Sequence, residues 1–437
     1  MTRTTVRNVR VFVGETLIEA ATVTFVETGI LSAGIADPAP ETSAGEAAAM
    51  VDGNGGTLLP GLIDAHTHLL PGSLQQSIGF GVTTELDMFS QPELLAQLRA
   101  EHDSGAEMAD FRSAGIGATA PGGHPSMMYG AFPTVTGPDG AEQFVADRMA
   151  EGSDYLKVIY DGDSPNPWGS PRLDRPAMVA LVEAAHRHGL TVSAHCTSAI
   201  GVAELVDAGA DVIQHVPLDR ELDDVVLQRM ASNGIAMTPT LATIEHVCGR
   251  DGGAVVADDP DLSPFLSGFW SLSLRRGVQP WSYGDLPDIA MAEHNVRRAA
   301  EAGVVVFAGT DCPNPGTVHG AGVHRELELL VNCGVSTTDA LRAATSGPAG
   351  TFGLSDRGRV ATGLRADLLL VEGDPTVDIR ATRRIRRIWR GGLPVDRAAY
   401  VGSDAEQRET DALRVQVARV MAEVSKRWPG ATEKSGQ

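Results

Sequence analysis

The sequence predicts an α/β protein built on a (β/α)8 barrel, or TIM barrel, with a small β-sandwich domain assembled from both ends of the chain. Short apolar runs alternate with helical stretches between about residues 58 and 353, as in a parallel sheet that helices cover. Eight strand–helix units over roughly 250–300 residues are typical of this barrel. Both ends of the chain instead contain short strand-like runs with no helices between them.

Composition and charge restrict the partners and the location of the protein. At 437 residues, with 43% hydrophobic and 21% charged residues, the chain has room for a large core. A net charge of −21 argues against nucleic acid and anionic membranes as partners, and no apolar run approaches the roughly 18 residues of a membrane span. The first residues lack the apolar core of a secretion signal, and the four cysteines form no C-x-x-C pair. We expect a soluble cytoplasmic protein that acts on a small molecule, and we expect it to form a homo-oligomer.

Residues 1–56 are predicted to form the N-terminal part of the sandwich. Val6–Val13 alternates polar and apolar residues, and Thr22–Val26 is β-branched, so both ranges favour strands. Ala36–Ala49 is rich in Pro, Ala and Glu, which predicts a loop before the barrel.

Residues 57–358 are predicted to form the barrel. Its strands are expected as short apolar runs at Leu62–His66, Val82–Met88, Arg112–Ala118, Tyr155–Tyr160, Thr191–His195, Asp211–His215, Ile235–Leu241 and Val304–Asp311. Helices are expected between several of them, at Pro92–His102, Asp174–His188 and Pro287–Ala302.

Residues 359–400 return to short strands, which predicts the C-terminal part of the sandwich. We expect Gly363–Asp374 and Ile385–Val395 to pair with the N-terminal strands. Residues 401–437 are predicted as a helix and a polar tail. The helix, Asp404–Arg427, is amphipathic and is expected to pack either on the barrel or on a neighbouring subunit.

A pair of histidines ends the first predicted barrel strand. His66 and His68 follow Leu62–Ala65, a short apolar run entered through Pro60-Gly61. Side chains two residues apart on a strand leave the same face, so both imidazoles can reach one point. A bare H-x-H is usually a pair of surface histidines, but here the pair ends an apolar strand. Because neutral imidazole is a common ligand of zinc and related metals, the pair predicts a metal site.

Six candidate metal ligands lie on predicted strands or at their ends, where the active site of such a barrel forms. They come from five different strands and are His66, His68, Lys157, His195, His215 and Asp311. A single histidine at a strand end often only binds a backbone carbonyl group. Agreement across five strands is harder to attribute to chance.

The segments that carry these residues resemble the amidohydrolase superfamily. They read PGLIDAHTH, YLKVIYDG, SAHC, DVIQHV and AGTD, and the resemblance extends from about Arg3 to Gly392. It is strongest to the branch that holds metal-dependent Xaa-dipeptidases and prolidase-like amide hydrolases.

The resemblance implies a binuclear centre with two divalent metal ions, and zinc is the expected metal. His66, His68 and Asp311 would hold the more buried ion, and His195 and His215 the more exposed one. Lys157 would carry a carbamate derived from carbon dioxide that bridges both ions. A free ammonium cannot coordinate a metal, whereas a carbamate is an anionic oxygen ligand; the alternative is a lysine paired with a nearby aspartate.

The chemistry expected of such a site is hydrolysis. Two metals lower the pKa of a bridging water and present hydroxide at neutral pH. Asp311 would orient the hydroxide, take its proton and pass it to the leaving amine. The resemblance also makes His124, in a Gly-rich loop after the third strand, a candidate for binding the carbonyl oxygen; the alternative is an ordinary loop histidine.

Four residues are predicted to contact the substrate. Tyr129 follows a Met127-Met128 pair at the expected mouth, and His319 lies in the loop after Asp311. Thr197 stands two positions after His195, where an aromatic residue in many dipeptidases of the branch holds the substrate carboxylate. Dipeptide recognition is therefore in doubt.

The fourth of these residues, Trp270, lies in a long segment, Gly249–Leu286, that is either a lid or an inserted helix packed on the barrel. The segment is rich in aromatic residues, namely Phe265, Phe269, Trp270, Trp281 and Tyr283. If it is a lid, the best substrate is an amide with an aromatic or apolar group.

The predicted function is cleavage of the C–N bond of a small amide, carbamoyl compound or N-acyl amino acid. A deaminase or cyclic-amide hydrolase is an alternative, but deaminase branches commonly use one metal and lack the bridging lysine, so Lys157 argues against them. A lactonase or esterase could use the same site. A non-enzymatic scaffold would typically have lost ligands, whereas all six positions are filled here.

Overall fold

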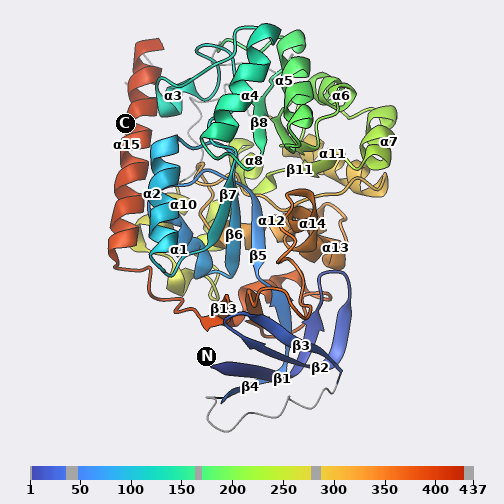
Figure 1. The fold of residues 1–437 in the computed structure, drawn as a ribbon, viewed down its shortest axis with the longest axis vertical. Helices are drawn as coiled ribbons and strands as arrows, with labels where there is room; N and C mark the ends of the chain where they lie inside the picture. Colours follow the sequence, from blue (N-terminus) through green and yellow to red (C-terminus); the bar gives the residue numbers. More distant parts are fainter. Residues whose placement is uncertain (1, 36–47, 163–169, 277–286, 428–437) are drawn as a thin grey trace.

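Two parallel sheets form the centre of the molecule, and a larger mixed sheet lies at one end of it (Figure 1). The computed structural model describes residues 2–35, 48–162, 170–276 and 287–427. The structure shows a mixed α/β fold in which helices surround the two parallel sheets.

The parallel sheets contain most of the strands predicted for the barrel. One has the order β5-β6-β7 and the other β11-β10-β9-β8. Their bounds are β5 Leu62–Thr67, β6 Val82–Asp87, β7 Asp110–Ser113, β8 Leu156–Ile159, β9 Val192–His195, β10 Val212–Gln214 and β11 Ala236–Thr238.

Isolated parallel bridges join these sheets to each other and to the segment after Val304. Ala118 pairs with Val158, Met237 with Val306, and Thr67 with Cys312. These pairs place residues 304–312 next to both β11 and β5, where the eighth strand was expected. The segment Val304–Asp311 is nevertheless not a regular strand, because Val306 alone forms a strand pair within it, although backbone hydrogen bonds join it to Met237 on one side and to Ala65 and His66 on the other.

Two other predicted strands are shorter than expected. The seventh, Ile235–Leu241, ends at Thr238 because Thr240 has a left-handed backbone (φ 53°) and Leu241 already begins helix α8. Glu326 stabilises that helix start, since its carboxylate accepts the backbone N–H groups of Leu241 and Ala242 at 3.0 and 2.7 Å. The third strand ends at Ser113 instead of continuing to Ala118.

The helices begin where the sequence offers capping residues. Asp174 accepts the N–H of Ala177 at the start of α5, and Ser198 and Asp288 cap α6 and α11 in the same way. The helices around the parallel sheets are α1 Ser73–Ile78, α2 Pro92–Asp103, α3 Ser126–Tyr129, α4 Ala141–Ala150, α5 Arg175–Arg187, α6 Ala199–Ala208, α7 Asp224–Asn233, α8 Leu241–Val247, α9 Gly252–Ala257, α10 Gly268–Leu274, α11 Ile289–Glu301, α12 Ala321–Asn332, α13 Thr337–Ala343 and α14 Ser346–Thr351. Short 3-10 helices lie at Pro138–Gly140, Ser263–Phe265 and Ile379–Arg383.

Strands from both ends of the chain meet in one seven-stranded sheet, as expected, although they form a single hydrogen-bonded sheet in the order β14-β13-β12-β4-β1-β2-β3. Their bounds are β1 Arg3–Phe12, β2 Leu17–Val26, β3 Gly29–Ile35, β4 Ala48–Pro60, β12 Leu368–Val371, β13 Ile385–Arg390 and β14 Leu393–Pro394. The central strand β4 is parallel to β1 and antiparallel to β12. Only Gly61 separates β4 from β5, so this sheet anchors the strand that carries His66.

The C-terminal helix α15 spans Asp404–Arg427, the predicted range, and packs on α1 and α3 of the same chain (Figure 1). Its Glu409 is fully buried, hydrogen-bonds to the Tyr400 hydroxyl, and has a carboxylate oxygen 3.9 Å from His319 Nε2. Packing on its own chain is therefore observed, while the homo-oligomer stays a prediction. Among the described residues, no helix combines the length and apolar composition that crossing a membrane requires.

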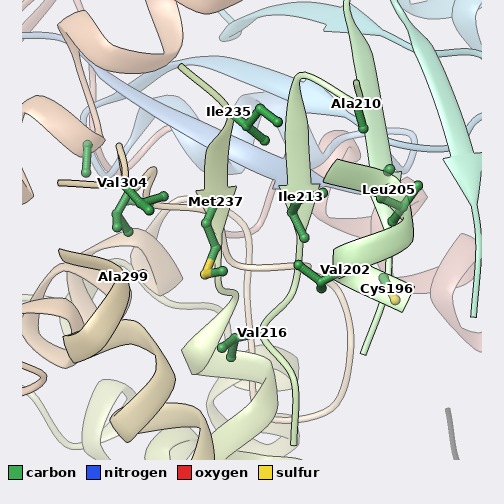
Figure 2. Close-up of a cluster of buried hydrophobic side chains, with 14 of the residues drawn as sticks. Cys196, Val202, Leu205, Ala210, Ile213, Val216, Ile235, Met237, Ala299 and Val304 are labelled. Carbon is green, nitrogen blue, oxygen red and sulfur yellow. The ribbon is translucent and has the colours of Figure 1, made fainter. Parts of the chain in front are cut away.

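Buried apolar side chains pack strand β10 against helix α6. Figure 2 shows Ile213 on this strand, with Val202 and Leu205 of α6 nearby in the same buried cluster. Because side chains alternate along a strand, Ile213 packs outward while its neighbour Gln214 faces the other way.

We expect Ile213→Ala to lower the free energy of unfolding by about 2–5 kcal/mol, because it leaves a cavity in this packed cluster. Urea denaturation would measure the change. Ile200→Ala is the matched control, since Ile200 on α6 is 42% exposed and its loss should change stability by less than about 0.5 kcal/mol. Equal effects of the two substitutions would contradict this assignment of the core.

Candidate metal centre

One group of predicted ligands lies close enough to hold a single metal ion. Asp311 Oδ1 is 3.3 Å from His66 Nε2 and 3.0 Å from His68 Nε2. Among the described residues, these three form the one group of side chains whose ligand atoms all lie within 4.8 Å of one another. The structure thus brings together the three residues expected to bind the more buried ion.

The other two predicted histidines extend this group. The ring centroids of His66 and His215 are 4.9 Å apart, and those of His215 and His195 are 4.5 Å apart. His124 continues the row, with its ring 5.3 Å from that of His195. The imidazoles therefore form one continuous cluster, although they come from β5, the ends of β9 and β10, and the loop before α3.

Lys157 lies on β8 and is buried beside this cluster. Besides burial, the positive charge of Lys157 lowers the pKa values of His66 and His215. The negative charge of Asp311 raises the pKa of Lys157. The Nζ atom of Lys157 is buried and has no hydrogen-bond partner among the residues that the structure describes. An unpaired buried amine is costly, so this atom is a candidate for binding a further group.

The protonation states suit metal ligands. Burial lowers the pKa of His66 to about 4 and the pKa of His215 well below its usual range, so both rings are neutral at neutral pH. Burial alone would raise the pKa of Asp311, but the positive charge of His66 and the hydrogen bonds of His66 and His68, in their protonated forms, outweigh it, so that this pKa lies well below its usual range and Asp311 is ionised before His66 loses its proton. Neutral imidazoles, an ionised carboxylate and an unpartnered buried amine are a donor set that fits a divalent metal centre.

Three residues of this region have left-handed backbone angles that are unusual for side chains other than glycine. His215, Thr240 and Asp311 have φ values of 73°, 53° and 56°. Such a residue costs roughly 1–3 kcal/mol, and strain of this kind often marks functional sites. Thr240 also binds the cluster directly, because its Oγ1 lies 2.7 Å from His215 Nδ1.

Two of the four predicted substrate residues lie near the cluster. Tyr129 packs its ring on Phe89, with centroids 4.4 Å apart, and its pKa is raised first by burial and then by the charges of Asp87 and Asp311. Thr197 is half-buried two residues after His195. His124, the expected carbonyl-binding residue, is solvent-exposed beside His195, and its pKa is lowered, first by desolvation and then by the charge of His195.

The other two substrate residues are not brought to the cluster, contrary to expectation. Trp270 is 1% exposed and packs with Leu413 of α15, because α10 turns its apolar face toward the C-terminal helix. His319 is fully buried, with Nδ1 3.2 Å from both Cys312 Sγ and a Glu85 carboxylate oxygen.

The long aromatic segment behaves in its described part as a packed insertion. Arg397 lies 3.7 Å over the ring of Phe265, and Arg414 of α15 lies 5.7 Å from the centre of Phe269. The remaining aromatics of the predicted lid, Trp281 and Tyr283, fall outside the described residues.

The sequence reasoning missed three residues that contact the histidines. Asp161 Oδ1 lies 3.2 Å from His195 Nε2, Gln214 Oε1 lies 2.7 Å from His66 Nδ1, and Thr240 has been described above. Asp161 could have been found, because it follows the strand of Lys157 in the same way as Asp311 ends the predicted eighth strand. Gln214 could not, since strand alternation predicts that it points away from its neighbour His215.

Comparison with known proteins identifies the family. Residues 57–407 match the amidohydrolase family. The chain belongs to this family and is a hydrolase that acts on C–N bonds.

Related sequences and structures agree with this. An uncharacterized protein of Mycobacterium tuberculosis is 29% identical over 348 residues, which cover 74% of this chain and 80% of that protein. Imidazolonepropionase of Deinococcus deserti is 37% identical over 103 residues, 23% of this chain and 26% of that enzyme. An Xaa-Pro dipeptidase with bound methionine superposes with a TM-score of 0.71 at 21% identity, covering 90% of this chain and all of that one. Phenylurea hydrolase B superposes with a TM-score of 0.70 at 20% identity, covering 91% and 97%.

We expect Lys157 to react with carbon dioxide more fully as the pH rises from about 6 to about 8. Burial lowers the pKa of its ammonium to about 7, so the neutral amine that attacks carbon dioxide passes from the minor to the major form. Carbon-13 NMR of metal-free protein at constant dissolved carbon dioxide would measure the carbamate. The signal should vanish in Lys157→Ala and remain in Lys426→Ala, because the exposed side chain of Lys426 lies on α15. A signal that falls with rising pH would contradict carbamate formation at Lys157.

Proposed function

We propose that this hydrolase is a binuclear metal-dependent enzyme that cleaves the C–N bond of a small amide, carbamoyl compound or N-acyl amino acid. One observation carries the proposal: a cluster of histidines, of which His66 and His215 are neutral, meets the ionised carboxylate of Asp311 and the unpartnered amine of Lys157. We further propose that the two parallel sheets and residues 304–312 form one eight-stranded barrel over residues 57–358. Residues 1–56 and 359–400 would form the accessory β domain, with 401–437 as its C-terminal extension.

Each predicted ligand has a place in this centre. His66, His68 and Asp311 would hold one ion, and His195 and His215 the other. A carbamate on Lys157 would supply the anionic oxygens that bridge them, which gives the buried amine its missing partner. Zinc is the proposed metal because imidazole and carboxylate are its usual ligands in catalytic sites. When bound, the two ions would acidify the attacking water and polarise the substrate carbonyl.

The protein's own residues would manage the proton and the developing charge. The Asp311 carboxylate, ionised at neutral pH, would accept the proton of the attacking water and then donate it to the leaving amine. His124 lies beside His195 and is neutral, so the N–H of its ring can donate a hydrogen bond to the carbonyl oxygen as negative charge develops there.

An apolar surface on the segment that follows His124 supports an aromatic or apolar amide as substrate. Tyr129 and Phe132 pack on Phe89, with ring centroids 4.4 and 5.0 Å away. Thr197 offers no aromatic ring for a substrate carboxylate. The structural similarity to phenylurea hydrolase B is compatible with this choice, whereas Trp270 no longer contributes to it.

A cyclic-amide hydrolase is the second candidate, because the partial match to imidazolonepropionase favours it. That match covers about a quarter of the enzyme. The bridging role proposed for Lys157 weighs against the single-metal members of this class, and an esterase or lactonase remains the third alternative.

We expect about two divalent metal ions per chain after purification in the presence of zinc and bicarbonate. Elemental analysis would measure them. Lys157→Ala should lose most of the activity, and short carboxylic acids should partly restore it by filling the cavity of the missing carbamate. One metal per chain that no addition of zinc or bicarbonate changes, or a fully active Lys157→Ala variant, would contradict the binuclear centre.

We expect anilides and N-acyl amides with an aromatic group to be better substrates than Xaa-Arg or Xaa-Lys dipeptides. Burial of a ring against Tyr129 should contribute about 2–3 kcal/mol, or roughly 30–150-fold in kcat/KM. Steady-state kinetics on a matched series, with an ester of each amide, would measure this preference. Tyr129→Ala should reduce it, whereas Phe269→Ala, which changes a ring packed near α15, should not. Faster hydrolysis of the cationic dipeptides or of the esters would overturn the proposed specificity.

A further inference from the structure

A chain of buried hydrogen bonds runs behind His66, on the side away from Asp311. His66 Nδ1 lies 2.7 Å from Gln214 Oε1, and Gln214 Nε2 lies 2.8 Å from Ser193 Oγ. The hydroxyl of Ser193 in turn donates to the sulfur of Met88 at 3.2 Å. All four side chains are at most 1% exposed, so water cannot replace any of these contacts.

The direction of each donor follows from the chemistry of the groups. The single hydroxyl proton of Ser193 is directed at the Met88 sulfur, so its oxygen is left to accept the amide N–H of Gln214. This orients the amide of Gln214 with its oxygen toward His66. An amide oxygen can only accept, so the proton of the neutral imidazole of His66 must lie on Nδ1.

This tautomer determines what the other ring nitrogen of His66, Nε2, can bind. With the proton on Nδ1, His66 Nε2 carries a lone pair, and it faces the Asp311 carboxylate oxygen at 3.3 Å. Two acceptors at this distance repel each other unless a cation lies between them. The hydrogen-bond chain therefore prepares His66 to bind a metal through Nε2.

The backbone explains why two consecutive residues, Gln214 and His215, both reach His66. The strand β10 ends at Gln214, and His215 has a left-handed φ of 73°, which breaks the strand alternation. As a result the ring of His215 lies 4.9 Å from that of His66 while the amide of Gln214 binds the same ring from behind.

We propose that Gln214 is a positioning residue that holds His66 in the tautomer with its proton on Nδ1 and thereby increases metal affinity. The part that concerns metal affinity rests on the proposed function, whereas the tautomer is a property of the metal-free protein. Outer partners of this kind typically contribute 10–100-fold to metal affinity.

The test compares two substitutions of Gln214. Gln214→Met keeps the side-chain volume but removes the oxygen that accepts from His66. Gln214→Glu keeps that acceptor, and its second oxygen can accept from the Ser193 hydroxyl. Nitrogen-15 NMR of the metal-free protein reports the tautomer of His66, with the signal assigned by its absence in His66→Asn. Competition with a chelator reports zinc affinity. Gln76→Met is the control, because Gln76 is equally buried but lies on α1, where its amide faces Glu409 and not His66.

Gln214→Met should mix the two tautomers of His66 and weaken zinc binding by 10–100-fold. Gln214→Glu should keep the Nδ1–H form. Gln76→Met should leave both the tautomer and the zinc affinity unchanged. An Nδ1–H signal that persists in Gln214→Met would overturn the proposal. So would zinc affinity within twofold of the wild type in that variant. If Gln214→Met does not fold, an Nε2–H tautomer in the wild type or in Gln214→Glu would overturn it equally. If the tautomers are as expected but the protein does not hydrolyse amides, the proposed function alone is rejected.

Discussion

The carboxyl group of Asp64 is the constraint on which the geometry of the candidate metal ligands depends. One of its oxygens accepts the backbone N–H groups of His66 and Thr310 at 3.1 and 3.0 Å, and the other accepts the Thr310 hydroxyl at 2.7 Å. It thus ties β5 to a segment that has no regular strand ladder. Because Asp311 follows Thr310 directly, this buried clamp also supports the strained backbone of Asp311.

The polar groups around this clamp hold three of the histidine rings in place. His66 is held by Gln214, His215 by Thr240 and His195 by Asp161, so each ring has a partner on one nitrogen. Lys157 Nζ and His68 Nδ1 have no hydrogen-bond partner among the described residues. A folded protein rarely leaves buried amines unpaired, and this contrast points to a group that binds on the inner side of the cluster.

The sequence was sufficient to predict which residues meet, because the carboxyl ends of neighbouring parallel strands lie at one edge of a sheet. His66, Lys157, His195 and His215 needed no more than this rule. The bounds of α15 also followed from its pattern of apolar residues. What failed were side chains whose surroundings come from distant segments: Trp270 turns toward α15.

Backbone conformation limited the prediction in a second way. A left-handed residue at the end of a strand redirects the side chains on either side of it, and simple alternation cannot show this. Gln214 and Thr240 were missed for that reason. The eighth strand was expected to be regular, yet residues 304–312 are held by isolated bridges and by Asp64 instead.

The pairing of the two chain ends has a consequence for biosynthesis. The ribosome makes β4 and the strand of His66 early, but β12, which pairs with β4, emerges only after every metal-binding residue. Glu409, which lies against His319 in the loop after Asp311, emerges later still. A nascent chain therefore exposes an unpaired edge of β4 and an uncovered His319 until synthesis is nearly finished. The candidate site is therefore completed only when the last part of the chain has been made, and until then β4 has an open strand edge of the kind that promotes association with other chains.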